Sequence, residues 1–540
     1  MTLSSSAHVD TFCRDNLPPS DSWPDLLVDG PDVRYPVRLN CGTALLDDVV
    51  AERGGQRECL LAPGAKTWSY QDLLDSANRI AGLLSTELGV VPGNRVMLRG
   101  PNNPWLVACW FGVLKAGAVV VATMPMLRAA ELRSVHEIAK IDLALCDHRF
   151  MDDLESAALD GVEIVAFGGA HDSDLTARIS SQPTTFADVD TAADDGALLA
   201  FTSGTTGRPK ATMHFHRDVL AIADTFSQHI LKPNPDDVFA GTPPLAFTFG
   251  LGGAVIFPLR VGARTLLIEK ATPVELAGHI ADNGVSICFT APTAYRAMIA
   301  AGCAAHLSTL RRAVSAGEHL DAAIWHAFFE ATGVKIIDGI GATEMLHVFI
   351  SAADDDIRPG STGRAVPGFR ARIVDLVGNT VEDGTPGRLA VQGPTGCRYL
   401  ADDRQLVYVE NGWNVTGDTF IRDEDGYFWY QARNDDMIVS SGYNIAGPEV
   451  EEAVLSHGDV LECAVIGWPD EARGSLVTAF VVLKDGVSSD DATALAIKEH
   501  VKAQIAPYKY PRQIRFVTEL PRTQTGKLQR FRLRPDATSS

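Results

Sequence analysis

The chain has 540 residues, and its 47 Lys and Arg against 68 Asp and Glu give a formal net charge of −21. A composition that is 46% hydrophobic and 21% charged is typical of a folded globular protein and excludes a disordered or coiled-coil chain. At roughly 100–200 residues per domain, this length predicts two to four domains. So acidic a chain is a poor candidate for non-specific binding to nucleic acid or to an anionic membrane.

The cysteines and the apolar segments indicate the compartment. Nine Cys occur without a CxxC pair, mostly in apolar surroundings, so we expect them to be reduced and buried. The first residues, MTLSSSAHVDTF, have no basic region followed by an apolar core, so no signal peptide is expected. The most apolar stretch, Ala116–Met126, is shorter than the ~20 residues that span a bilayer. We therefore expect a cytoplasmic protein without a membrane span.

Predicted helices and strands alternate in the N-terminal part of the chain. Apolar residues at helical spacing predict a helix over Asp72–Leu88. A strand at Arg95–Arg99, a helix at Trp105–Lys115 and a strand at Ala118–Ala122 follow. The pattern returns between residues 197 and 349, with strands expected near Leu198–Thr202, Ser286–Thr290 and Lys335–Asp338. This alternation predicts largely parallel sheets covered by helices on both faces.

The composition changes after residue 360. Short runs at Ala371–Val374, Gly387–Val391 and Gly426–Gln431 predict a β-rich module. Beyond it, a helix from Pro448 with Val450, Ala453 and Val454 on its inner face begins a small α+β unit. Its other expected elements are strands at Cys463–Gly467, Val477–Leu483 and Ile514–Val517 and a helix at Asp490–Ala506. We predict a large domain over residues 1–432, a hinge over 433–436 and a small domain over 437–540.

A loop of hydroxyls and glycines follows one buried strand. Residues 200–210 read AFTSGTTGRPK, and Gly204 and Gly207 allow the backbone to approach a ligand closely. Successive N–H groups with Ser and Thr hydroxyls form an anion nest, to which Lys210 adds a positive charge. The segment is not a Walker A motif, because Pro precedes the Lys and Ala211 follows it. It predicts a phosphate-binding loop rather than an ordinary polar turn.

Four more segments follow in a fixed order: Asp338–Glu344 (DGIGATE), Thr416–Asp418 (TGD), Arg433–Ile445 (RNDDMIVSSGYNI) and Pro521–Lys527 (PRTQTGK). With Thr202–Lys210 (TSGTTGRPK) they resemble the signature motifs of the adenylate-forming superfamily, which comprises acyl-CoA synthetases, peptide-synthetase adenylation domains and luciferases. The resemblance covers essentially the whole chain. It implies a large N-terminal region of parallel α/β sheets with a β-rich module, and a small mobile α+β C-terminal domain.

The resemblance also implies a reaction and roles for the matching residues. A carboxylate attacks the α-phosphorus of ATP, pyrophosphate leaves, and a thiol then displaces AMP. Lys527 bridges the carboxylate and the α-phosphate, Thr343 contacts the α-phosphate, and Glu344 holds Mg²⁺. Asp435 is the hinge, about which the small domain rotates between the two half-reactions. The residues expected to bind ATP or AMP are Thr202, Ser203, Gly204, Thr205, Thr206, Gly207, Lys210, Gly317, Glu318, Asp338, Gly339, Ile340, Gly341, Asp418 and Arg433.

Within this set, Ser203, Thr205, Thr206 and Lys210 are expected at the β- and γ-phosphates, and Asp418, supported by Arg433, at the ribose. Asp338 lies where the family contacts the adenine amino group. Ile340 departs from the pattern, because many members carry an aromatic residue at this position for stacking on adenine. After rotation, Ser441, Gly442 and Tyr443 are expected to line a tunnel for the pantetheine arm of coenzyme A.

Residues 244–253, PLAFTFGLGG, predict a flat apolar wall beside the acyl group. With DGIGATEMLHVF they resemble the benzoate–CoA ligase branch. HVDTFCRDNLPP and ATMHFHRDVLAIADTF are most similar to 2-aminobenzoate–CoA ligases. We expect an acyl pocket made of Phe247, Thr248, Phe249, Gly250, Ala342 and His347. The substrate expected there is a benzoate with an ortho amino or hydroxyl group, which Thr248 and His347 would contact. Core packing of the two Phe and a structural role for His347 are the alternatives.

Other functions stay open at this point. An aryl-AMP ligase that loads a carrier protein would use the same motifs. SSGYNIAGPE at residues 440–449 is also similar to medium-chain acyl-CoA synthetases. A non-catalytic nucleotide-binding regulator is a third alternative, disfavoured because Lys527 and Glu344 are both present. A zinc hydrolase is not supported, because His214 and His216 have no nearby acidic or Cys partner at ligand spacing. The sequence leaves monomer and homodimer open.

Overall fold

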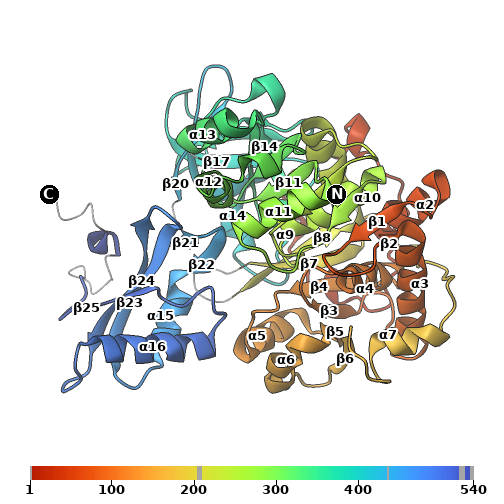
Figure 1. Ribbon diagram of the computed structural model, residues 1–540, viewed down its shortest axis with the longest axis horizontal. Coiled ribbons are helices and arrows are strands. Elements are labelled where there is room, and N and C mark those ends of the chain that lie inside the picture. The colour runs from red at the N-terminus through yellow and green to blue at the C-terminus, as the bar shows by residue number, and fades with distance from the viewer. Residues whose placement is uncertain (1–2, 203–208, 321, 434–436, 522–529, 535–540) are drawn as a thin grey trace.

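A computed structural model of the chain describes residues 3–202, 209–320, 322–433, 437–521 and 530–534. A large domain carries three sheets, and a small domain lies beside it at the C-terminal end of the chain (Figure 1). Among the described helices, none is both long and apolar enough to cross a bilayer. All nine Cys are buried and free, as expected from the sequence.

The first sheet has six strands in the order β6-β5-β3-β4-β7-β8. Neighbouring strands are parallel except β7 and β8, which run antiparallel on either side of the predicted phosphate loop. The bounds are β3 (Arg95–Arg99), β4 (Val119–Thr123), β5 (Leu143–Asp147), β6 (Glu163–Phe167), β7 (Gly196–Thr202) and β8 (Lys210–Phe215). Its helices include α3 (Tyr70–Thr86), α4 (Pro104–Lys115), α5 (Ala129–Ala139) and α6 (Met151–Ala157). Helix α3 begins two residues before the predicted start, at a capping box between Ser69 and Asp72.

The second sheet has nine strands in the order β15-β14-β13-β12-β11-β9-β10-β1-β2. The strands are β1 (Glu58–Leu61), β2 (Trp68–Ser69), β9 (Val238–Gly241), β10 (Arg264–Leu266), β11 (Ile287–Thr290), β12 (Arg312–Ser315), β13 (Ile336–Gly341), β14 (Val348–Ser351) and β15 (Arg364–Ala365). The strands from β13 to β1 are parallel, and β2, β14 and β15 are antiparallel to their neighbours. The sheets are therefore mixed: most neighbouring strands are parallel, as predicted, whereas β8 in the first sheet and β2, β14 and β15 in the second are antiparallel to their neighbours.

Helices cover these sheets. Those of the second half of the large domain are α8 (His216–Ile222), α9 (Thr248–Leu251), α10 (Phe257–Val261), α11 (Pro273–Asn283), α12 (Pro292–Ala300) and α13 (Ala322–Thr332). One hydrophobic cluster spans both sheets and includes the fully buried Phe111 of α4 and Phe239 of β9. The two sheets therefore share a core and behave as one packed body.

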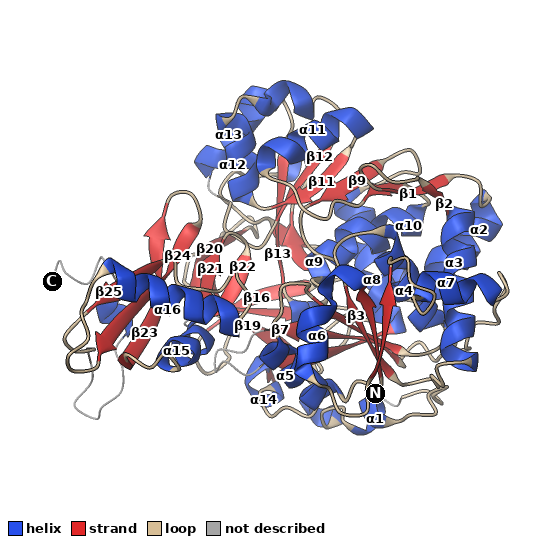
Figure 2. Ribbon diagram, turned by 60° about the horizontal axis from the view of Figure 1, so that its bottom comes forward, coloured by secondary structure: helices blue, strands red, loops and turns tan. Residues whose placement is uncertain are grey.

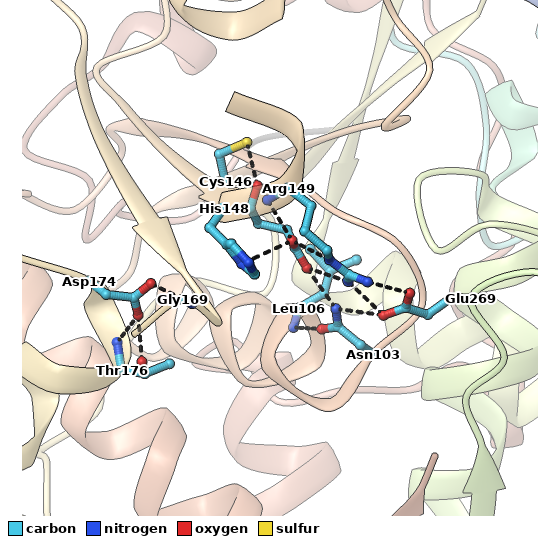
Figure 3. A network of polar contacts seen from close by, with 10 residues as sticks. Asn103, Leu106, Cys146, His148, Arg149, Gly169, Asp174, Thr176 and Glu269 are labelled. Atoms are coloured by element: carbon cyan, nitrogen blue, oxygen red, sulfur yellow. Dashed lines mark hydrogen bonds and ion pairs between the residues drawn. The ribbon is translucent and has the colours of Figure 1, made fainter. Parts of the chain in front are cut away.

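A polar network also joins the two sheets at one edge (Figure 3). Arg149, just after β5, donates to both carboxylate oxygens of Glu269, which follows β10, at 2.7 and 2.8 Å. The same guanidinium pairs with Asp147, and Asn103 donates to Asp147 at 3.0 Å while capping α4 through the N–H of Leu106. These half-exposed contacts fix orientation more than they add stability.

The predicted β-rich module is the third sheet, which is antiparallel throughout. Its strands are β16 (Arg370–Val374), β17 (Gly387–Gln392), β18 (Val409–Glu410), β19 (Trp413–Arg422) and β20 (Phe428–Arg433), with α14 (Gln405–Tyr408) between β17 and β18. Strand β20 ends at the predicted hinge, whose residues 434–436 lie outside the described residues.

The small domain begins with a hairpin on the side that faces the large domain (Figure 1). The hairpin is β21 (Met437–Ser440) with β22 (Tyr443–Ala446), and a three-stranded sheet follows of β23 (Val460–Asp470), β24 (Gly474–Leu483) and β25 (Gln513–Phe516). Helices α15 (Gly447–Leu455) and α16 (Asp491–Gln504) cover the sheet (Figure 2). Val450, Ala453 and Val454 of α15 are buried in the core of this domain, as the helical spacing predicted.

Candidate active site

A cavity of about 660 Å³ opens at the carboxyl ends of strands from the first and second sheets of the large domain. Thr123 and Thr202 end β4 and β7, and Ala291, Gly317 and Gly341 lie at or just after the ends of β11, β12 and β13. Ligands of open α/β sheets bind at these ends, because the loops there diverge and leave a crevice. Of the predicted site residues, those that line the cavity are Thr202, Phe247, Thr248, Phe249, Gly317, Gly341, Ala342, Thr343, His347, Ser441, Gly442 and Tyr443.

One end of the cavity is an aromatic chamber around His347. The imidazole centroid lies 4.6 Å from that of Phe257, 5.3 Å from that of Phe226 and 5.6 Å from that of Phe249. Neither ring nitrogen of His347 makes a hydrogen bond of good geometry to a described residue, although the side chain is 3% exposed; the backbone of Phe249 interacts with the ring and favours its protonated form. Burial lowers the pKa of His347 to about 3, so the ring is neutral and offers one N–H donor and one lone pair.

The loop before α9 forms the wall opposite this ring. Phe247 and Thr248 line the cavity at the start of α9, and Phe249 lies within 5.3 Å of the Phe289 ring. Gly250 does not line the cavity. A Cβ at this position would meet the carbonyl oxygen of Pro244 at 2.1 Å, so the tight turn requires glycine.

Next to the cavity-lining residues Pro209 and Thr343 in the chain lies a cluster of two charges and a phenol, whose members do not line the cavity themselves. Lys210 Nζ is 3.2 Å from Glu344 Oε1, and the Tyr399 hydroxyl donates to the same oxygen at 2.5 Å while it accepts from Lys210. Burial opposes ionisation of Glu344, but Lys210 and Tyr399 outweigh burial, so the pKa of Glu344 lies below its usual value. Glu344 is therefore a carboxylate. Tyr399 was not predicted from the sequence.

Buried polar residues lie at and near the loop that carries Thr343 and Glu344. His214 Nε2 lies 2.8 Å from the carbonyl oxygen of Thr343, and burial lowers the pKa of His214 to about 4. The neutral ring must therefore donate through Nε2. Arg398 pairs with Asp218 in the same region, and both side chains are fully buried. His214 and Asp218 lie four residues apart in β8 and α8, whereas Arg398 lies 180 residues beyond Asp218, so the sequence did not predict that they meet.

The predicted adenine-binding residues only partly reach this cavity. Gly317 lines it with φ of +87°, whereas Asp338 lines a separate small cavity beside Trp325 and Gly360. Burial raises the pKa of Asp338 well above its usual value, and its Oδ1 has no partner among the described residues. Burial likewise raises the pKa of Glu318.

The remaining nucleotide-site residues lie on paired strands. Gly339 and Ile340 lie within β13, opposite β14, and Ile340 packs against the main core. Asp418 and Arg433 are opposite each other on β19 and β20, which agrees with the expectation that they act together.

The third part of the cavity lies between the two domains. The turn Ser441–Gly442 has φ of +51° and +80°. It faces Gly317 of the large domain: a Cβ added to Gly317 would lie 3.6 Å from the carbonyl oxygen of Gly442. Tyr443 stacks on Tyr508 at 4.3 Å and lies 6.2 Å from Phe247 across the domain boundary. The hairpin of the small domain therefore lines the cavity close to Phe247 and Gly317 of the large domain.

A buried ion cluster also crosses the domain boundary. Lys509 Nζ lies 2.6 Å from Glu131 of α5 in the large domain and 2.6 Å from Glu449 of α15. Burial raises the pKa of Glu449 to about 7. Burial opposes the charge on Lys509, but Tyr508 and the two carboxylates outweigh it and raise the pKa of Lys509 above its usual range. Glu131, Glu449, Tyr508 and Lys509 line the cavity and were not predicted to do so.

Several predicted residues lie outside the described residues: Ser203, Gly204, Thr205, Thr206, Gly207, Asp435, Lys527 and the side chain of Arg433. Their roles stay predictions. Within the described part of the chain, no group of three His, Cys, Asp or Glu side chains has the geometry to hold a metal ion. The ionised carboxylate of Glu344 suits a hard cation such as Mg²⁺, provided that ATP phosphates supply most of the other ligands.

Comparison with known proteins decides the family. The AMP-binding enzyme family matches residues 47–399, and the AMP-binding enzyme C-terminal domain matches residues 449–527. The chain belongs to the AMP-binding enzyme family. The family region 47–399 contains Lys210, Thr343 and Glu344, and ends at Tyr399.

Relatives of this AMP-binding enzyme span nearly its full length. The benzoate–CoA ligase of Thauera aromatica is 34% identical over 93% of this chain and 97% of its own. The 3-hydroxybenzoate–CoA ligase of Aromatoleum sp. (strain CIB) is 32% identical over 87% of this chain and 92% of its own. The crystal structure of the anthranilate CoA ligase AuaEII in complex with anthranoyl-AMP is 35% identical, with a TM-score of 0.72, over 93% of this chain and 98% of that one. The predicted resemblance to benzoate–CoA and 2-aminobenzoate–CoA ligases is confirmed.

Proposed function

We propose that this AMP-binding enzyme is an ATP-dependent aryl-CoA ligase. It activates an ortho-substituted benzoate, 2-aminobenzoate or salicylate, as aryl-AMP and transfers the aryl group to coenzyme A with release of AMP. The observation that carries the proposal is the continuous cavity described above. An aromatic chamber at His347, the motif residue Thr343 and the hairpin turn at Gly442 all line it. Acid, adenylate and thiol would thus meet in one space.

The first step joins two anions, so the site must supply positive charge and oriented dipoles. Lys210 and the loop 203–207 bind the β- and γ-phosphates, and Thr343 orients the α-phosphate. The ammonium of Lys527 bridges the carboxylate and the α-phosphate. Glu344 would hold Mg²⁺, which would supply further positive charge at the phosphates. The carboxylate oxygen bonds to the α-phosphorus, and the bond to the pyrophosphate oxygen breaks.

The second step uses the hairpin of the small domain. Rotation about Asp435 removes Lys527 and brings Ser441, Gly442 and Tyr443 to the cavity, where the pantetheine arm enters. The thiolate of coenzyme A attacks the aryl carbonyl, and AMP leaves with the electron pair of the acyl–oxygen bond. The positive φ at Gly442 supports this path, because a residue without a side chain lets a ligand approach the backbone.

The preference for an ortho group is based on His347 and Thr248. His347 is buried in an apolar chamber, and neither of its ring nitrogens makes a hydrogen bond of good geometry to a described residue. An amino or hydroxyl group on the ring of the substrate would satisfy one of them. A site built to bind such a group rejects analogues without it, because the buried polar atom is then left unpaired.

An AMP-release screen tests the proposed substrate class. Benzoate, 2-aminobenzoate, salicylate and octanoate are compared with ATP and either coenzyme A or a phosphopantetheinyl carrier protein. We expect 2-aminobenzoate or salicylate to give the highest kcat/KM, and coenzyme A to be the acceptor. Equal turnover of benzoate would refute the ortho preference. Preference for octanoate or for the carrier protein would replace the proposal by one of its two alternatives.

A second test addresses the predicted lysine. Lys527→Ala should lose ATP–pyrophosphate exchange by at least about 100-fold, because a charge aimed at the transition state is removed, while ATP binding is largely kept. Lys484→Ala, an exposed lysine of the same domain, is the matched control and should leave exchange unchanged. Unchanged exchange in the Lys527 variant would contradict the assigned mechanism.

A further inference from the structure

Tyr399 occupies a position that no family motif discussed above assigns. Its side chain is fully buried, and its hydroxyl donates to Glu344 Oε1 at 2.5 Å and accepts from Lys210 Nζ. A phenol has one hydrogen to donate, and here it goes to the anion while the oxygen accepts from the cation. Lys210 Nζ also lies 4.5 Å from the centroid of the Tyr399 ring. One side chain therefore contacts both charges of the cluster.

The backbone of Tyr399 is held rigidly beside the strand that begins with Lys210. The N–H of Leu400 donates to Ala211 and that of Met213 donates to Arg398, so this segment pairs with β8. The N–H of Tyr399 itself donates to Gln405 Oε1 at 2.9 Å. Because the segment is fixed to β8, the phenol has little freedom to follow a movement of either charged partner.

We propose that Tyr399 is a positioning residue for the adenylation step. Its hydroxyl holds the Lys210 ammonium and the Glu344 carboxylate so that both keep one side toward the phosphate site. The proposal rests on the phosphate and metal roles assigned to Lys210 and Glu344 under the proposed function. Glu344 would hold Mg²⁺, and its contacts with Tyr399 and Lys210 both fall on Oε1.

Without the hydroxyl, the two charges have each other as their nearest partners. They already lie 3.2 Å apart, and in a buried site with few other donors they would form a closer ion pair. Such a pair would neutralise the cation meant for the phosphates and would occupy the carboxylate meant for the metal. The phenol therefore keeps the two groups separately available.

Tyr399→Phe removes only the hydroxyl and tests the proposal. A hydrogen bond to charged groups predicts a fall of about 10- to 100-fold in kcat/KM for ATP, measured by pyrophosphate exchange. The Mg²⁺ concentration for half-maximal exchange should rise. Formation of aryl-CoA from added aryl-AMP and coenzyme A should stay within about twofold of the parent chain, because that step no longer uses the β- and γ-phosphates.

Tyr70→Phe is the matched control. Tyr70 is also buried, and its hydroxyl donates to the carbonyl oxygen of Ala263 at 2.6 Å. Its described contacts include neither Lys210 nor Glu344. We expect this variant to lose thermal stability without any change in the ATP or Mg²⁺ dependence. If Tyr399→Phe behaved in the same way, or slowed both half-reactions equally, its hydroxyl would be structural only and the proposal would be overturned.

Lys210→Met, alone and combined with Tyr399→Phe, separates this inference from the proposed function. Because Tyr399 acts through Lys210, its substitution should cost little more once the lysine is gone, and additive losses would overturn the proposal. If Lys210→Met itself kept full exchange, the assigned phosphate site would be wrong. Loss of exchange in Lys210→Met with parent-like Tyr399→Phe would refute the inference and leave the proposed function standing.

Discussion

At the residue scale, His347 is a buried polar side chain in an apolar chamber. It is a neutral imidazole among four aromatic rings, and neither ring nitrogen makes a hydrogen bond of good geometry to a described residue. A buried polar group without a partner is costly unless a ligand supplies one. The role of His347 toward the substrate and the alternative of a structural histidine both stay predictions.

His347→Phe tests this role directly. It keeps an aromatic ring in the chamber and removes the donor and the acceptor. We expect the ratio of kcat/KM for 2-aminobenzoate to that for benzoate to fall by about tenfold or more, because the ortho group loses its partner. Parallel losses for both acids would indicate a packing defect instead and would contradict a contact with the ortho group.

The low pKa of His347, about 3 against a usual 6.5, also predicts acid sensitivity. Between these values the unfolded chain binds a proton that the folded chain does not. The free energy of unfolding therefore falls as the pH drops from about 6.5 toward 3. Above about pH 6.5 His347 causes no such loss, because the ring is neutral in both states. At about pH 5 the loss is about 2 kcal/mol for this residue.

His214 and His216, with pKa values of about 4 and about 3, act in the same direction. The difference in Tm between about pH 7.5 and about pH 5 should be smaller in His347→Phe than in the parent chain. An unchanged difference would show that His347 does not contribute to acid sensitivity.

At the scale of elements, the turn from α9 into the next helical segment shapes the chamber. The segment 244–253 was expected to lie beside the acyl group, and its glycines allow close packing. A Cβ on Gly252 would lie 2.4 Å from His347 Cδ2 and 3.0 Å from Phe257 Cζ. The backbone of this element is therefore one wall of the chamber, and the position of the imidazole depends on it.

Gly252→Ala should displace His347. Overpacking of this kind costs about 1–3 kcal/mol, so we expect a lower Tm together with a loss of kcat/KM for the aromatic acid. Gly278→Ala within α11 is the control, because no atom lies within 4 Å of the added Cβ. This second change should be neutral or stabilising by up to about 1 kcal/mol. Equal behaviour of the two variants would contradict a close contact at His347.

At the scale of the whole molecule, the orientation of the small domain is stabilised by buried charges. Lys509 joins Glu131 of the large domain to Glu449 of its own domain, and all three side chains are at most 14% exposed. The same orientation brings Ser441, Gly442 and Tyr443 onto the cavity. Rotation of the small domain would have to break the Lys509–Glu131 contact, so this ion pair favours the orientation proposed for thioester formation.

Glu131→Gln removes the charge on the large-domain side only. We expect aryl-CoA formation from aryl-AMP to slow by about 5- to 30-fold, as for a loss of one or two kcal/mol, with pyrophosphate exchange kept or increased. Glu137→Gln, an exposed residue of the same helix, should change neither step. Equal slowing of both half-reactions by Glu131→Gln would contradict a role in orientation.

Local sequence patterns determined the family of this protein, many of the residues that line its cavity and the elements of its small domain. The run of hydroxyls and glycines between β7 and β8, the DGIGATE segment that begins within β13 and the order of the five motifs predicted the family. They also predicted many of the residues that line the cavity. These features were readable because each lies on one continuous segment, where alternation, glycine and capping patterns act over a few residues. The small α+β domain was readable for the same reason.

Only the tertiary structure decided what supports the site. Tyr399 meets Lys210 across 189 residues, Arg398 meets Asp218 across 180 and Lys509 meets Glu131 across 378. The antiparallel edge strands of the large sheet likewise depend on which segments lie side by side. Such pairings leave no periodic signal in one sequence, because they depend on the packing of whole sheets and domains rather than on neighbouring residues. The net charge of −21 therefore said nothing about Lys210, Glu344 and Tyr399, whose arrangement exists only in the fold.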